Sequence, residues 1–93
     1  MKWLEVIMVR SVGKNTKVLA STLRELMKDL ADDFEHEAIQ VFSREKLDSD
    51  ICIMLFHEEK KTKTGGSPLG QRLVDALQEF NLVYHTVWIE MEN

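Results

Sequence analysis

The sequence lacks several features that would assign it to a specialised class of proteins. Cys52 is the only cysteine, so no disulfide bond can form within the chain, which is typical of a reducing compartment. No stretch reaches the roughly 20 apolar residues of a membrane span. Glu5 also interrupts the short apolar stretch at the start of the sequence, whereas a secretory signal needs an unbroken one. We therefore expect a cytoplasmic protein with no membrane partner.

Basic residues are also few. The 12 lysines and arginines stand against 16 aspartates and glutamates, which gives a formal net charge of -4. A nucleic-acid surface would need a clustered excess of positive charge, so we expect no nucleic-acid partner. The 44% hydrophobic and 30% charged residues are those of an ordinary globular protein, and the length of 93 residues predicts a single domain spanning residues 1–93.

The apolar residues predict six elements in the order strand, helix, strand, strand, helix, strand. The strands are expected at residues 3–11, 38–44, 51–56 and 82–91, where apolar residues are dense or alternate with polar ones. This order predicts an α+β, ferredoxin-like βαββαβ fold. Its four-stranded antiparallel sheet would have the strand order 4-1-3-2, with both helices on one face.

Each helix is predicted from a start signal and a stripe of apolar residues. Asn15 or Thr16 can cap the first helix. Ser67 can cap the second, where Pro68 takes the first helical position because its missing N–H costs nothing there. Apolar residues at three- and four-residue steps mark the buried stripes. These are Val18, Leu19, Leu23, Leu26, Leu30 and Phe34 in the first helix and Leu69, Leu73, Ala76, Leu77 and Phe80 in the second.

Both faces of the predicted sheet are apolar, although two helices can cover only one of them. We assign one set of residues to the helices: Leu4, Val6, Met8, Ile39, Val41, Ile51, Ile53, Leu55, Val83, Val87 and Ile89. The opposite set includes Glu5 and a few other polar residues among Trp3, Ile7, Val9, Phe42, Cys52, Met54, Phe56, Tyr84 and Trp88. Soluble monomers rarely expose so large an apolar surface. We predict a homodimer through this sheet face; the alternative is that loops or carboxyl-terminal residues cover it.

The order and lengths of these elements resemble the dimeric α/β-barrel superfamily, and most of all its antibiotic-biosynthesis-monooxygenase branch. The resemblance rests on the strand at 3–10, the helix at 16–30, the hairpin formed by 38–44 and 50–56, and the helix that contains Ser67-Pro68-Leu69 and Ala76-Leu77. It implies that two chains form a dimeric α/β barrel face to face. Some members of this family oxidise polycyclic aromatic substrates without a metal or prosthetic group, some degrade haem, and many have no known activity.

This sequence departs from the family pattern after the third strand. The family often has a tryptophan there and a histidine in the following helix, whereas this chain has His57-Glu58-Glu59 and then a basic loop.

Several polar residues are candidates for a site at one edge of the sheet. We treat the first and third strands as parallel neighbours, so that their carboxyl ends, the starts of both helices and the start of the fourth strand share that edge. His57 and His85 would then lie about 10 Å apart, too far for a direct hydrogen bond but able to bracket a ligand. The residues placed at this edge are Arg10, Ser11, Asn15, His57, Ser67, Tyr84 and His85.

The candidate roles follow from the chemistry of these side chains. His85 or His57 could act as a general base, because histidine titrates near neutral pH, and Arg10 could stabilise developing negative charge. Tyr84, Trp88, Ser67 and Asn15 are the candidate ligand-binding residues. The alternative is that the histidines are merely solvated or bonded to a neighbour and that Tyr84 and Trp88 pack at an interface.

Three other sequence features bear on possible sites. Lys60, Lys61 and Lys63 precede the start of the second helix and could help to hold an anion, although a solvated loop is the alternative. Glu35-His36-Glu37 lacks the spacing of metal ligands, so we expect no metal site. Cys52 lies among apolar residues and is expected to be a small core group.

Two functions remain open from the sequence. We favour a non-catalytic binding or assembly module, in which the aromatic face serves assembly and the possible ligand is small and apolar or anionic. The alternative is a cofactor-independent monooxygenase or isomerase that acts on a small apolar or aromatic molecule. No cofactor is expected in either case.

Overall fold

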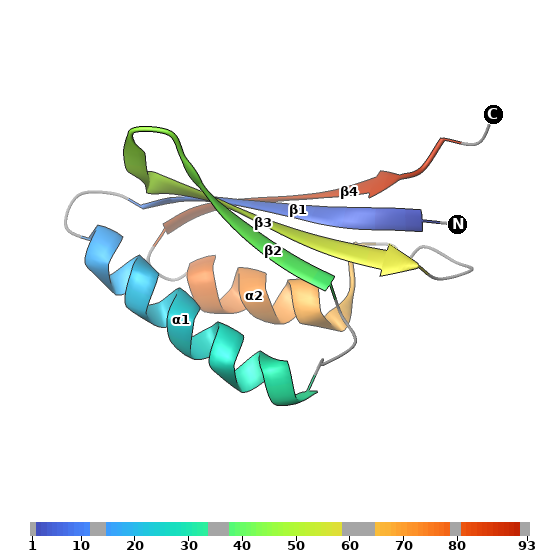
Figure 1. Ribbon diagram of the computed structural model, residues 1–93, viewed down its shortest axis with the longest axis horizontal. Helices are drawn as coiled ribbons and strands as arrows, with labels where there is room; N and C mark the ends of the chain where they lie inside the picture. The colour runs from blue at the N-terminus through green and yellow to red at the C-terminus, as the bar shows by residue number, and fades with distance from the viewer. Residues whose placement is uncertain (1, 12–14, 34–37, 59–64, 79–80, 92–93) are drawn as a thin grey trace.

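Four strands form one sheet, and both helices cover the same face of it, as Figure 1 shows. The computed structural model describes residues 2–11, 15–33, 38–58, 65–78 and 81–91. The elements are β1 (Lys2–Ser11), α1 (Asn15–Asp33), β2 (Ala38–Arg44), β3 (Leu47–Glu58), α2 (Pro68–Gln78) and β4 (Asn81–Ile89). The predicted order of elements and the ferredoxin-like α+β fold are confirmed.

The sheet order β2-β3-β1-β4 is the predicted order read from the other edge. All three pairs of neighbouring strands are antiparallel. The assumption that the first and third strands run parallel is therefore wrong. The crossover through α1 makes β1 parallel to β2, and the hairpin then reverses the chain, so β3 runs opposite to β1. As a result Arg10 at the end of β1 pairs with Asp50, while His57 near the end of β3 pairs with Trp3.

β3 begins at Leu47, earlier than residue 51, and a two-residue turn of Glu45 and Lys46 connects it to β2. Lys46 has a φ of 63°, in the left-handed region that tight hairpin turns use. The register of β2 and β3 shifts between Ser43 and Arg44. Such a bulge bends and twists a hairpin. Figure 1 shows the tip of this hairpin rising on the side of the sheet away from the helices.

β1 presents the opposite set of residues to the helices from the set predicted. Trp3, Glu5, Ile7 and Val9 are buried on the helix side, whereas Met8 is exposed on the other. The assignment of Leu4, Val6 and Met8 to the helices is therefore wrong, because both faces of β1 are apolar and the pattern of this strand does not distinguish them. The assignment is correct for β3, where Ile53 and Leu55 are fully buried.

The core lies between the sheet and the two helices. Its strand residues are apolar, and α2 contributes a leucine at every fourth position, as a buried helical stripe requires. Val18 of α1, which was expected in the stripe, is 43% exposed. The buried core residues are Ile7, Val9, Leu19, Leu23, Ile53, Leu55, Leu69, Leu73 and Leu77. Within the described residues, neither helix is long and apolar enough to cross a membrane.

The boundary of the α1 stripe can be tested with two adjacent residues. Leu19 is 1% exposed, so Leu19→Ala should lower the free energy of unfolding by about 2–5 kcal/mol through lost burial and a residual cavity. Val18→Ala should change it by less than about 1 kcal/mol. Urea unfolding followed by circular dichroism measures both. Equal losses in the two variants would contradict this orientation of α1.

Candidate functional site

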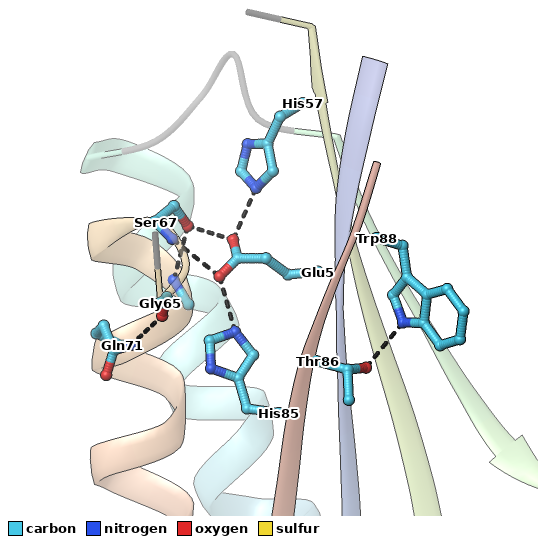
Figure 2. A network of polar contacts seen from close by, with 9 residues as sticks. Glu5, His57, Gly65, Ser67, Gln71, His85, Thr86 and Trp88 are labelled. Carbon is cyan, nitrogen blue, oxygen red and sulfur yellow. Dashed lines mark hydrogen bonds and ion pairs between the residues drawn. The ribbon is translucent and has the colours of Figure 1, made fainter. Parts of the chain in front are cut away.

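A buried carboxylate lies where α2 begins against the sheet. Glu5 is 0% exposed and points from β1 toward the first turn of α2 (Figure 2). An ionised carboxylate in such a place is strongly destabilising unless it is paired and hydrogen-bonded. The surroundings of Glu5 meet this requirement with donors from three separate segments of the chain.

Each oxygen of the Glu5 carboxylate accepts two hydrogen bonds. Oε1 accepts from the backbone N–H of Ser67 at 2.9 Å and from His85 Nε2 at 2.8 Å. Oε2 accepts from His57 Nε2 at 2.7 Å and from the hydroxyl of Ser67. Because an ionised carboxylate can only accept, both histidines carry a proton on Nε2. The two histidines therefore bracket Glu5 itself.

The protonation of Glu5 is determined by a competition between burial and hydrogen bonding. Burial raises the pKa of Glu5, but the hydrogen bonds from Ser67, His57 and His85 lower it by more, and the resulting pKa lies below the ordinary value of 4.5. The positive end of the α2 dipole acts in the same direction as these hydrogen bonds. Glu5 is therefore a carboxylate at neutral pH.

Ser67 connects this carboxylate to the helix. Its hydroxyl accepts a hydrogen bond from Gly70 N–H at 3.0 Å, as an N-cap does, while donating to Glu5. Its carbonyl accepts the first helical bond, from Gln71 N–H, also at 3.0 Å. The predicted role of Ser67 as a cap is confirmed, and its hydroxyl is engaged by Glu5.

Two glycines let α2 approach Glu5 closely. A Cβ on Gly70 would lie 2.8 Å from Glu5 Cδ, and one on Gly66 would lie 2.9 Å from His85 Nε2. Real Cβ atoms do not approach heavy atoms so closely, so a side chain at either position would displace the carboxylate or the imidazole. Gly66 also has a φ of 101°, which other residues rarely adopt.

Trp3 closes the cluster on the side of His57. The two rings stack with centroids 4.1 Å apart and planes inclined by 24°. Trp3 Nε1 is buried and has no hydrogen-bond partner in the described part of the chain. His57 is thus held between an indole face and a carboxylate, which fixes the orientation of its ring.

The remaining candidates lie on the other face of the sheet. Figure 2 shows Trp88, whose Nε1 donates to Thr86 Oγ1 at 2.8 Å, on the opposite side of the strands from Glu5, His57 and His85. Arg10 and Tyr84 share this second face. Arg10 lies two residues after the exposed Met8 on β1, and Tyr84 of β4 pairs in register with Met8. The structure therefore brings His57, His85 and Ser67 together and separates them from Arg10, Tyr84 and Trp88.

Some of the other candidate residues lie outside the described part of the chain, and others can be placed. The side chain of Asn15, the lysines 60, 61 and 63 and the segment 35–37 lie outside the described residues. Ser11 is buried at the end of β1, where its hydroxyl donates to the carbonyl of Ser49 at 3.3 Å. Among the residues that the structure describes, no three histidines, cysteines, aspartates or glutamates are arranged to hold a metal ion.

Glu5 is the central residue that sequence reasoning missed. The purely aliphatic set of this strand, Leu4, Val6 and Met8, was assigned to the helices, which put Glu5 on the opposite face. The available signal was its position between Trp3 and Ile7 in an otherwise apolar strand. A single charge at such a position is compatible with burial only where the charged group is paired.

The second face contains a hollow of about 560 Å³ at the end where the β2–β3 hairpin bends. Its walls include Met8, Phe42, Cys52 and Tyr84, and Arg10, Arg44 and Asp50 line it as well.

Cys52 is thus half-buried on this face, not a core group as predicted. Burial raises the pKa of the Cys52 thiol, so this sulfur is protonated and weakly nucleophilic at neutral pH.

The role of Glu5 in stability can be tested by its pH dependence. Because its folded-state pKa is lowered, the carboxylate stabilises the fold fully above the unfolded-state pKa, and this contribution is lost as the pH falls toward the folded-state pKa. Glu5→Gln turns an amide N–H toward hydrogen-bond donors and should cost about 1–3 kcal/mol at neutral pH. The difference from the wild type should shrink between about pH 5 and pH 3.

Urea unfolding across this pH range measures the effect. The exposed Glu25→Gln in α1 is the matched control and should leave stability nearly unchanged throughout. A Glu5→Gln deficit that stays constant or grows on acidification would contradict the assignment.

The close approach of α2 to Glu5 predicts an unusual response at Gly70. Gly→Ala within an ordinary helix stabilises by about 1 kcal/mol through helix propensity. Gly70→Ala should instead destabilise by about 1–3 kcal/mol, because the new methyl group overlaps the carboxylate. In a Glu5→Ala background the same substitution should be neutral or stabilising. Stabilisation by Gly70→Ala in the wild-type background, measured by thermal unfolding, would refute the contact.

Comparison with known proteins gives a likeness of structure. No family model and no curated protein matches the sequence. An antibiotic biosynthesis monooxygenase of known structure superposes with a TM-score of 0.62 at 11% identity, over 97% of this chain and 99% of that one. Rv0793 from Mycobacterium tuberculosis superposes with a TM-score of 0.65 at 12% identity, over 100% of this chain and 98% of that one. The predicted resemblance is therefore confirmed at the level of fold: this chain has the ferredoxin-like fold of the antibiotic biosynthesis monooxygenase along nearly its whole length.

Proposed function

We propose that the chain is a homodimeric binding module whose two sheets pack face to face. The observation that carries this proposal is the open face, by which we mean the face of the sheet away from the helices. Large apolar side chains on it are exposed in the single chain: Trp88 and Tyr84 at 59%, Met8 at 55%, Leu82 at 51%, Phe42 at 48% and Phe56 at 38%.

The energetics favour covering this face. Burial of about 1,000 Å² of apolar surface at about 25 cal/mol per Å² is enough to offset an association cost of about 4–15 kcal/mol. Tryptophan, tyrosine, phenylalanine and methionine, which dominate the open face, are also the residues enriched at protein interfaces. Both helices lie on the opposite side (Figure 1), so they leave this surface uncovered.

A second copy of the chain is a partner of suitable shape and chemistry. A two-fold interface uses the same patch on both subunits, and the centre of the open face is apolar. Charged residues lie at its two ends: Arg10, Arg44 and Asp50 at one end, and Lys2, Glu58 and Glu90 at the other. An apolar centre with a polar rim is the usual composition of a stable interface.

Binding is favoured over the alternative of a cofactor-independent monooxygenase or isomerase. That reaction would need a base, an anion-stabilising group and aromatic walls around one reacting atom. The candidate bases His57 and His85 lie on the helix side and are bonded to Glu5. Arg10 and Tyr84, which would supply the other functions, lie on the open face.

The dimer can be tested with charges on the open face. Trp88→Glu, which lies outside the hollow on this face, should convert a dimer into a monomer, because a glutamate from each chain would be buried in the interface without a partner. Light scattering coupled to size-exclusion chromatography measures the mass. Val18→Glu, at an exposed position of α1, is the matched control and should remain dimeric. A wild-type monomer at high protein concentration would refute the proposal.

A further inference from the structure

We propose that the hollow on the open face binds a small aromatic acid, a flat apolar ring system that carries one carboxylate or sulfonate. The proposal deepens the binding function proposed above by naming the class of ligand. The hollow itself is formed by one chain, so its occupancy can be tested separately from dimer formation.

The hollow exists because the β2–β3 hairpin bends over the open face. The register shift between Ser43 and Arg44 introduces the bend, and Figure 1 shows the hairpin tip on the side away from the helices. The bent hairpin and the neighbouring ends of β1 and β4 line a half-open hollow of about 560 Å³. This volume falls in the usual range of small-molecule sites, about 300–1,000 Å³.

The walls of the hollow suit a flat aromatic ring. Phe42 approaches from β2, Cys52 from β3, Met8 from β1 and Tyr84 from β4. Aromatic rings stack on or meet other rings edge to face, and a methionine sulfur makes favourable contacts with ring edges. A rigid ligand also loses little conformational entropy on binding. An aromatic body is therefore better suited to this space than a flexible or polar one.

The polar residues of the hollow carry an excess positive charge. Asp50 accepts from Arg10 Nε at 3.2 Å and from Arg44 Nη1 at 3.1 Å, so one carboxylate serves two guanidinium groups. The pKa of Asp50 is lowered by these arginines, first of all by the hydrogen bond from Arg10, so it is ionised at neutral pH. Two positive charges and one negative charge leave a net charge of one that an anion could neutralise.

The guanidinium groups are positioned to meet such an anion. Each guanidinium has five N–H donors, and Asp50 uses only one or two from each arginine. The side chains of Arg10 and Arg44 remain 58% and 59% exposed. Because Asp50 is hydrogen-bonded to both arginines, their guanidinium groups lie close together, and a ligand carboxylate could meet donors from both. Arginine pairs readily with carboxylates through two parallel hydrogen bonds.

Two probes of equal shape test the charge requirement. Naphthalene-2-carboxylate should bind at least about tenfold more tightly than naphthalene-2-carboxamide, since a charge-assisted hydrogen bond contributes more than a neutral one. Isothermal titration calorimetry gives the affinities, and added salt should weaken the carboxylate more than the carboxamide. Equal affinities, or failure of both probes to bind, would overturn the proposal.

Substitutions locate the binding site. Arg44→Gln and Arg10→Gln should each lower the affinity for the carboxylate toward that for the carboxamide, and Phe42→Ala should weaken both probes alike. Arg24→Gln, an exposed position on α1, removes the same charge from the helix side and should leave both affinities unchanged. An equal loss in Arg24→Gln would show that the effect depends on net charge alone and would refute the site.

The mass of each sample, measured under the same conditions, separates the two proposals. A dimer that binds neither probe would overturn the aromatic-acid site and leave the assembly standing. A monomer that binds the carboxylate selectively would overturn the assembly and leave the site standing. Circular dichroism of every variant identifies any loss of affinity that comes from unfolding.

Discussion

The buried carboxylate of Glu5 is the constraint on which the arrangement of this domain depends. Charge-assisted hydrogen bonds are stronger than neutral ones, and Glu5 makes them to the end of β3, to β4 and to the first turn of α2. The same carboxylate requires Gly66 and Gly70, because a side chain at either position would occupy its space or that of His85. One ionised group thus determines how closely α2 can pack on the sheet.

The two faces of the sheet carry different kinds of side chain. The buried side of the sheet contains the charged and titratable cluster, whereas the solvent-facing side of the single chain carries tryptophan, tyrosine and phenylalanine. Within the cluster, both oxygens of the Glu5 carboxylate are fully hydrogen-bonded. The open face contains the unsatisfied apolar surface, and for this reason the proposed assembly and ligand binding both belong to it.

A single irregularity in the hairpin gives the open face its shape. Without the shift at Ser43 and Arg44, β2 and β3 would continue the regular twist of the sheet. With it, the hairpin curves toward the ends of β1 and β4 and brings Arg44 to Asp50, which already pairs with Arg10. Aromatic walls and an excess of positive charge are thereby placed around one hollow. The aromatic and charged side chains that line this hollow lie on the opposite face of the sheet from the Glu5 cluster.

The sequence by itself determined the secondary-structure elements and their order, because these depend on local patterns of residues. Helical spacing of leucines, the cap and proline at Ser67 and Pro68, and runs of strand-forming residues specify six elements in order, and the rules of chain connection then give the sheet order. The resemblance in fold followed from the same pattern. The sequence also indicated that both faces of the sheet are apolar. Both alternating sets of strand residues are rich in apolar side chains, so this conclusion holds whichever set faces the helices.

Only the tertiary structure decided the orientation of β1 and the partners of its charge. β1 is apolar on both sides, so its two possible orientations give the same pattern, and packing against α2 selects one of them. Glu5 is separated from His57 by 52 residues and from His85 by 80. No local signal connects groups so distant in the chain. The strand register brings these groups together. A carboxylate can be buried there because its hydrogen-bond donors meet at that one place.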